Sequence, residues 1–108
     1  MYILIDDVRD IDKYVHGNCD KLVIRTFDQA INFISITDIT NDTLLMDNDL
    51  GDLGEGREGY DILNFALTND NKPKCVYIVS SNPVGRKRMS LALEANGYVY
   101  RAGRYVLC

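Results

Sequence analysis

Four short apolar segments, each followed by polar residues, constrain the fold of this chain more than any other feature of its sequence. They cover residues 2–5, 22–24, 43–46 and 75–79. Their length and composition are typical of buried strands. Stretches with helical spacing of apolar residues separate them. Strands that alternate with helices predict a parallel sheet with helices on both faces.

Helical spacing and capping residues predict the connections between these strands. The expected helices cover residues 8–15, 27–34, 60–67 and 83–96. Thr26 with Gln29 forms a capping box before the second helix, and Asn82 precedes a proline at the first position of the fourth. Residues 48–59 are polar and rich in glycine, which predicts a mobile loop.

The pattern at the end of the chain predicts strands and not a further helix. Residues 98–101 and 104–107 flank an Ala-Gly pair, which predicts a fifth strand, a hairpin turn and a short last strand. Tyr98, Tyr100 and Tyr105 alternate as strand residues do, and this pattern favours packing in the sheet over a platform for stacking bases. The predicted core includes Ile3, Ile5, Val23, Leu45, Val76 and Ile78.

Length and composition indicate one soluble domain. The 108 residues are 46% hydrophobic and 26% charged, which is ordinary for a globular protein, so we expect a single domain over residues 1–108. No apolar run reaches the length of a membrane helix, and acids follow the first apolar run too early for a signal peptide. Three scattered cysteines, an odd number, favour the reducing cytoplasm. With only one histidine beside them, the sequence also argues against a zinc site.

Acidic and hydroxyl side chains follow three of the predicted strands. Asp6 and Asp7 follow the first, Asp47 and Asp49 follow the third, and Ser80 follows the fourth. Ligands bind outside the carboxyl ends of the strands in open parallel sheets. Clustered carboxylates need a cation, and oxygen ligands favour Mg²⁺ or Mn²⁺. The alternative is that these acids are separate loop residues that cap helices.

Basic residues near the fourth strand indicate a phosphate site. The helix that begins after Asn82 offers free backbone N–H groups to an anion, and Arg86 lies in its first turns. Arg9 is a further candidate, with an ion pair to a neighbouring aspartate as the alternative. Residues 1–61 carry 14 acids and 5 bases, and residues 62–108 carry 2 acids and 7 bases. This division fits an acidic metal pocket facing a basic segment, and it also fits an accident of solubility.

The aspartate pair after the first strand and the aspartate after the third resemble the receiver domains of two-component signalling. This resemblance implies a flavodoxin-like, three-layer α/β sandwich with a mainly parallel five-stranded sheet of order 2-1-3-4-5. It also implies that Asp6 and Asp7 hold magnesium and that Asp47 accepts a phosphoryl group. The lysine that ends the fifth strand of receivers and their fifth helix have no counterpart here.

Four segments are more similar to a receiver-related family, the cyclic-phosphate-processing receiver domains, found in small phage and bacterial proteins. Its motifs are roughly D-D-x-R, D-H-D-L-G, G-Y-D-x-L and H-S-x-N-P-x-G. The matching segments are Asp6-Asp7-Val8-Arg9, Asp47-Asn48-Asp49-Leu50-Gly51, Gly59-Tyr60-Asp61-Ile62-Leu63 and Ser80-Ser81-Asn82-Pro83-Val84-Gly85. Asn48 and Val79 stand where the family has histidines. If those histidines are the acid and base, the loss of each lowers the rate by about 10²–10⁴-fold.

The resemblance implies a site with divided roles. Asp6, Asp7 and Asp47 would hold the metal, and Asp47, Asp49 and Ser80 would carry the chemistry. Arg9, Ser81, Asn82 and Arg86 would bind the phosphate. The D-x-D of Asp47 and Asp49 also resembles that of haloacid-dehalogenase phosphatases and Toprim nucleases.

Three functions follow from these patterns. The first is metal-dependent hydrolysis of a cyclic or terminal phosphate of a nucleotide or RNA end, by a phosphodiesterase that lacks the family's two histidines. The second is a non-catalytic protein that binds a phosphate ligand or a host protein partner, such as a phage factor acting on a host pathway. The third is a phosphoacceptor receiver. The net charge of −4 argues against broad binding of double-stranded DNA.

Overall fold

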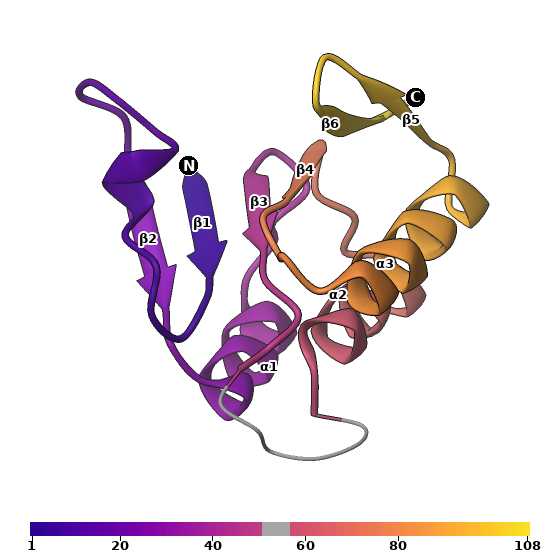
Figure 1. Cartoon of the computed structure of the whole chain (residues 1–108), viewed down its shortest axis with the longest axis horizontal. Helices are drawn as coiled ribbons and strands as arrows, with labels where there is room; N and C mark the ends of the chain where they lie inside the picture. Colours follow the sequence, from indigo (N-terminus) through magenta and orange to yellow (C-terminus); the bar gives the residue numbers. More distant parts are fainter. Residues whose placement is uncertain (51–56) are drawn as a thin grey trace.

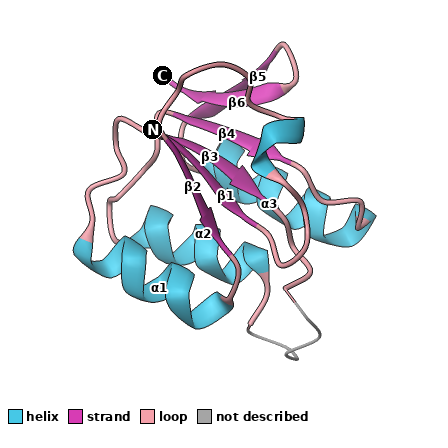
Figure 2. Ribbon diagram, turned by 90° about the vertical axis from the view of Figure 1, so that its left-hand side faces the viewer, coloured by secondary structure: helices cyan, strands magenta, loops and turns pink. Residues whose placement is uncertain are grey.

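Six strands form one sheet in the order β2-β1-β3-β4-β6-β5 (Figures 1 and 2). The computed structural model describes residues 1–50 and 57–108. The strands are β1 (Tyr2–Ile5), β2 (Lys21–Ile24), β3 (Thr43–Met46), β4 (Cys75–Ile78), β5 (Tyr98–Arg101) and β6 (Arg104–Leu107). The first four run parallel, with Ile5 opposite Met46 and Met46 opposite Ile78. The predicted receiver-like α/β class is therefore confirmed.

Three α-helices pack on one face of this sheet, so the three-layer sandwich expected from the sequence, with helices on both faces, lacks α-helices in one layer. The three helices are α1 (Phe27–Ile36), α2 (Gly59–Thr68) and α3 (Pro83–Ala95), and each begins at a capping residue that the structure shows bonded. Alternate strand residues such as Ile3, Leu44 and Val76 join the helices in the larger core. Figure 1 shows α2 and α3 side by side. Of the six predicted core residues, four are buried, and Val23 and Ile78 are partly buried.

The prediction of a helix over residues 8–15 is wrong. This segment contains only a 3₁₀ turn, η1 (Ile11–Lys13), and Val8 is exposed. The reason lies in Asp6, whose carboxylate accepts hydrogen bonds from the backbone N–H groups of Val8 and Arg9. An aspartate that binds these N–H groups holds the chain in a loop, in competition with a helix. Ile11 and Val15 still bury against Leu4 and Leu45, so they form a thin layer on the second face of the sheet.

The predicted strand order 2-1-3-4-5 is also wrong at one edge. The last strand, β6, lies beside β4 and runs antiparallel to it, and β5 pairs only with β6 at the edge (Figure 2). Ala102 and Gly103 both have positive φ, as a tight hairpin turn requires. Residues 99–101 of β5 are exposed, whereas β6 contributes the buried Tyr105. The more apolar strand of the hairpin therefore takes the inner position.

Two further expectations from the sequence concern the glycine-rich loop and membrane-spanning helices. The loop predicted over residues 48–59 falls mostly on residues 51–56, which lie outside the described residues. Among residues 1–50 and 57–108, no helix combines the length and the apolar character that crossing a membrane requires.

Candidate functional site

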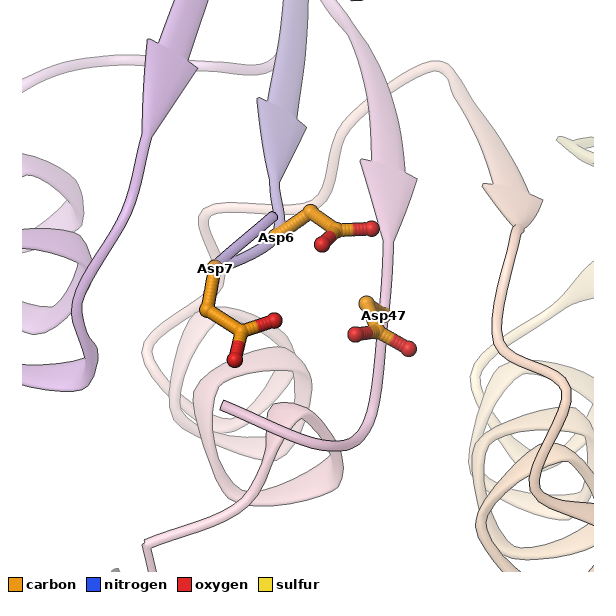
Figure 3. A group of neighbouring side chains, drawn as sticks. All are labelled: Asp6, Asp7 and Asp47. Atoms are coloured by element: carbon orange, nitrogen blue, oxygen red, sulfur yellow. The ribbon is translucent and has the colours of Figure 1, made fainter. Parts of the chain in front are cut away.

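The carboxyl ends of β1 and β3 bring three carboxylates together (Figure 3). Asp6 and Asp7 directly follow β1, and Asp47 directly follows the neighbouring β3. One carboxylate oxygen from each of the three residues lies within 4.8 Å of the other two. Asp6 and Asp47 are buried, and Asp7 is half-buried. We call these three residues the acidic cluster.

The surroundings of the cluster separate the pKa values of its two buried acids. Burial raises the pKa of Asp47, and the negative charge of Asp6 raises it further. Burial also acts to raise the pKa of Asp6, but the N–H groups of Val8 and Arg9 and the Arg9 guanidinium outweigh it, so the pKa is lowered. Two buried carboxylates at short range favour a cation beside them.

Arg9 supplies positive charge to this cluster. Its Nη1 lies 2.9 Å from Asp6 Oδ2 and 3.2 Å from Asp47 Oδ1. The hydrogen bond to Asp6 raises the pKa of the guanidinium. The predicted phosphate ligand Arg9 therefore reaches the site, and it forms the ion pairs that the sequence offered as its alternative role.

The end of β4 contributes Ser80 and Asn82. Ser80 is buried, and its hydroxyl accepts a hydrogen bond from the backbone N–H of Asn82 and acts to lower the pKa of Asp47. The side-chain oxygen of Asn82, Oδ1, caps α3 by accepting from the N–H groups of Val84 and Gly85 at 3.0 and 3.2 Å. Two N–H groups that a bound anion would use are therefore already bonded.

The other predicted site residues lie around this strand end. The Asn82 amide donates to Oδ1 of the exposed Asp49 at 3.3 Å, so Asp49 is linked to the fourth strand. Ser81 is exposed. The Arg86 guanidinium donates to the backbone carbonyls of Ile78 and Ser80 at 3.1 and 2.8 Å, which fixes α3 against β4.

Positions 48 and 79 have different surroundings. The Asp47 N–H donates to the carbonyl of Ile5 and the Val79 N–H donates to that of Met46, so the parallel ladder continues one residue past the strands. Asp6, Asp47 and Val79 therefore lie at the same level on adjacent strands, and alternation places them on one face. The side chain of Asn48 points the other way. It is buried, and its Oδ1 accepts from the Tyr60 N–H at 3.1 Å.

Two contributors to the site escaped the sequence interpretation. Arg25 donates to the backbone carbonyls of Asp6 and Arg9 and so helps to fix the loop after β1. It directly follows β2, and its place at the same edge of the sheet was the available signal. Gly59 lies so close to the backbone carbonyl of Asp47 that a Cβ atom there would overlap it. A glycine before an apolar helical pattern gave only a weak indication of this contact.

The donor atoms of the acidic cluster fit a hard divalent cation. All are carboxylate oxygens, which suit Mg²⁺ or Mn²⁺ better than zinc. The single histidine, His16, lines a different cavity with Tyr2 and Cys19, near the amino ends of the strands. Within the described residues, the acids that could hold a metal are those of this cluster.

Comparison with known proteins identifies one family. The model of the family described as "Cyclic-phosphate processing Receiver domain" matches residues 1–95. Neither a curated protein nor a solved structure matches the chain.

Proposed function

Because this chain belongs to the cyclic-phosphate processing receiver domain family, we propose that it binds a phosphate group beside a divalent cation and hydrolyses an ester bond of that phosphate. The proposed substrate carries a cyclic or terminal phosphate on a nucleotide or an RNA end. The observation that carries this proposal is the acidic cluster. Three carboxylates from two adjacent strands converge within 4.8 Å, on the edge of the sheet where ligands of such folds bind.

The cation would be held by Asp6, Asp7 and Asp47. Mg²⁺ or Mn²⁺ bound there would act as a Lewis acid and neutralise charge on the phosphate. The chain itself offers a second positive group, because Arg9 lies between Asp6 and Asp47. When a cation neutralises those acids, the guanidinium is free to pair with a phosphate oxygen instead, where bidentate geometry strengthens binding.

The residues at the end of β4 have separate roles in this proposal. Asp49 is exposed next to the cluster, and we assign it the part of general base. The amide of Asn82, which already contacts Asp49, would orient a phosphate oxygen together with Ser80 and Ser81. Arg86 supports the site by fixing Ser80 through its backbone carbonyl and adds positive charge nearby.

Metal binding and turnover test this proposal directly. Mg²⁺ should raise the melting temperature of the parent chain, because a ligand that binds only the folded state stabilises it. Hydrolysis of 2′,3′-cyclic nucleotides should require the cation. Asp47→Ala should abolish both effects, whereas Asp20→Ala, at an exposed residue before β2, should change neither. A parent chain that shows no response to Mg²⁺ or Mn²⁺ contradicts the proposal.

A second candidate is a phosphate-binding protein without turnover. The observation that favours it is the pair of residues Asn48 and Val79, since neither side chain can transfer a proton. Tight, Mg²⁺-dependent binding of a cyclic nucleotide that stays intact over hours would establish this function. Phosphorylation of Asp47 is less well supported. Because β6 separates β5 from β4, Arg101 at the end of β5 lies one strand further from Asp47 than the order 2-1-3-4-5 would place it.

A further inference from the structure

A groove with a basic wall and an aromatic wall lies between α3 and the β5–β6 hairpin. Its volume is about 510 Å³, within the usual range for sites that bind small molecules. Arg86, Lys87 and Ser90 line it on the α3 side, and Tyr100 and Tyr105 line it on the hairpin side. Ile78 of β4 forms part of its floor.

The burial of the tyrosines revises the interpretation that Tyr98, Tyr100 and Tyr105 all pack in the sheet. Tyr98 and Tyr105 are buried, as that interpretation requires, but Tyr100 is 61% exposed. The rings of Tyr100 and Tyr105 meet at 64° with centroids 5.1 Å apart. Tyr105 is itself held by a hydrogen bond between its hydroxyl and that of Ser90. The exposed ring is therefore supported from behind by a fixed residue.

The groove and the acidic cluster both lie beside the end of β4. Arg86 lines the groove and donates to the carbonyl of Ser80, whose hydroxyl acts on Asp47. Ile78 also lines the groove and pairs with Met46, the residue before Asp47. The Ile78 side chain packs against the helix-side core, whereas Asp47 lies level with Val79 on the opposite face, so the end of β4 stands between the groove and the cluster. A ligand that passes this strand end at Ser80 would contact both.

We propose that this groove is the subsite for the base of a nucleotide whose phosphate lies at the acidic cluster, with Tyr100 as the stacking residue. The inference rests on the proposed function and specifies its substrate as a nucleotide or a nucleotide at an RNA end. Every base offers a face to an aromatic ring, so such a site accepts different bases. Arg86 and Lys87 give the groove the positive charge that suits a phosphate-bearing ligand.

Calorimetry on the full chain with Mg²⁺ tests the subsite. The probes are inorganic phosphate, 2′,3′-cyclic AMP, and a short RNA that ends in a 2′,3′-cyclic phosphate. The parent should bind cyclic AMP more tightly than phosphate. Tyr100→Ala should weaken binding of cyclic AMP by about tenfold and leave the affinity for phosphate and Mg²⁺ unchanged. If only the RNA shows the loss, the base belongs to an RNA end.

Matched variants separate stacking from a change in folding. Tyr100→Phe keeps the ring and should bind like the parent, as should Val99→Ala on the same strand. Lys87→Gln, on the opposite wall, should weaken cyclic AMP binding, whereas Arg88→Gln should not, because that guanidinium pairs with Glu58 outside the groove.

Two results would overturn the subsite while leaving the proposed function intact. One is equal affinity of Tyr100→Ala and the parent for cyclic AMP and for the RNA. The other is equal affinity of the parent for phosphate and for cyclic AMP, since the base then contributes nothing. Failure of the parent to bind Mg²⁺ and every phosphate probe overturns both proposals.

Discussion

The two positions at which this chain lacks a histidine of its family are not equivalent. Val79 lies level with Asp47 on the neighbouring strand, and the hydrogen bond from its N–H to Met46 continues the ladder there. Asn48 is buried on the helix side and bonds the N–H of Tyr60. A proton carrier is therefore useful at position 79, whereas position 48 serves the packing of α2.

This difference predicts opposite results for two histidine substitutions. Val79→His should raise the rate of Mg²⁺-dependent hydrolysis of 2′,3′-cyclic nucleotides by about 10²-fold, the lower end of the range for a positioned acid or base. Asn48→His should give no increase, and it should lower the melting temperature because the larger ring meets α3. Steady-state rates near neutral pH measure the first effect. An increase with Asn48→His alone would show that position 48 faces the substrate.

Arg9 provides a second prediction at the residue scale. In Arg9→Met, Asp6 and Asp47 lose their shared positive partner. Breaking a fully buried pair costs about 3–5 kcal/mol, and because the Arg9 side chain is 26% exposed, the free energy of unfolding should fall by less than that. Mg²⁺ should restore more stability to this variant than to the parent, since the cation no longer competes with a guanidinium. Binding of phosphate in the presence of Mg²⁺ should weaken by about 1.5–3 kcal/mol.

Chemical denaturation with and without Mg²⁺ measures the first two effects, and calorimetry measures the third. Arg57→Met is the control, because its ion pair with Asp28 is exposed and contributes little. Equal stabilisation of the parent and Arg9→Met by Mg²⁺ would mean that Arg9 does not occupy space that the cation needs.

The elements around the site pack through two glycines at the starts of helices. A Cβ atom on Gly59 of α2 would overlap the backbone carbonyl of Asp47, and one on Gly85 of α3 would overlap the side chain of Asn48. Both helices therefore approach the segment after β3 more closely than any other residue type would allow. This close approach positions the cluster, the α3 cap and Tyr60 relative to one another.

Gly85→Ala tests this packing. The overlap with Asn48 should lower the free energy of unfolding by about 1–3 kcal/mol, as overpacking of a core does. In an Asn48→Ala background the same substitution should have a smaller effect, because the side chain that it meets is gone. Denaturation of the four proteins gives the coupling energy of this pair. Additive losses would indicate that α3 shifts as a whole instead of meeting Asn48.

Element boundaries that depend on local chemistry could be predicted from the sequence, and those that depend on tertiary context could not. The capping residues Thr26 and Asn82 predict where α1 and α3 begin, and both side chains accept hydrogen bonds from backbone N–H groups in the first turn of their helix. The helix expected at residues 8–15 fails because Asp6, two residues earlier, captures the N–H groups of Val8 and Arg9. Apolar spacing contains no information about this capture.

The candidate site divides in the same way. Convergence of Asp6, Asp7 and Asp47 could be predicted from the sequence, because parallel strands end at one edge of their sheet. The hairpin order could not, because either of two short strands can pair with β4. The partners of Arg86 also depend on how α3 meets the end of β4.

At the scale of the whole molecule, the two faces of the sheet are covered unequally. Three helices form the larger core on one face, while η1 and its neighbours cover only part of the other. The hairpin extends the sheet past β4. Its first residue, Tyr98, contacts the segment that precedes β4, because the Tyr98 hydroxyl donates a buried hydrogen bond to the backbone carbonyl of Pro73. The edge of the sheet and the body of the domain should therefore unfold together.

Alkaline pH tests this cooperativity. Burial raises the pKa of Tyr98 above its ordinary value, and burial likewise raises the pKa of the nearby Cys75 thiol. Unfolded Cys and Tyr lose their protons near pH 8.5 and 10. The folded chain keeps these protons longer, so the unfolded chain binds fewer protons and the free energy of unfolding falls as pH rises. Full stability is present below about pH 8.5, and the decline steepens above about pH 10, where each such group contributes at most about 1.4 kcal/mol per pH unit.

Tyr98→Phe separates the contribution of the phenol. At pH 7 the variant should lose about 1 kcal/mol with the hydrogen bond to Pro73, and above pH 10 its stability should fall less steeply than that of the parent. Tyr100→Phe, at an exposed ring of the same strand, should follow the parent at every pH.

The measurement is urea denaturation between pH 7 and 11, followed both by far-ultraviolet circular dichroism and by tyrosine fluorescence. Coincident curves from the two probes would show that the hairpin unfolds with the domain, whereas an earlier transition in tyrosine fluorescence would show that it opens first. Parallel pH profiles for the parent and Tyr98→Phe would mean that Tyr98 ionises as freely in the folded chain as in the unfolded one, and that its burial does not link the hairpin to global stability.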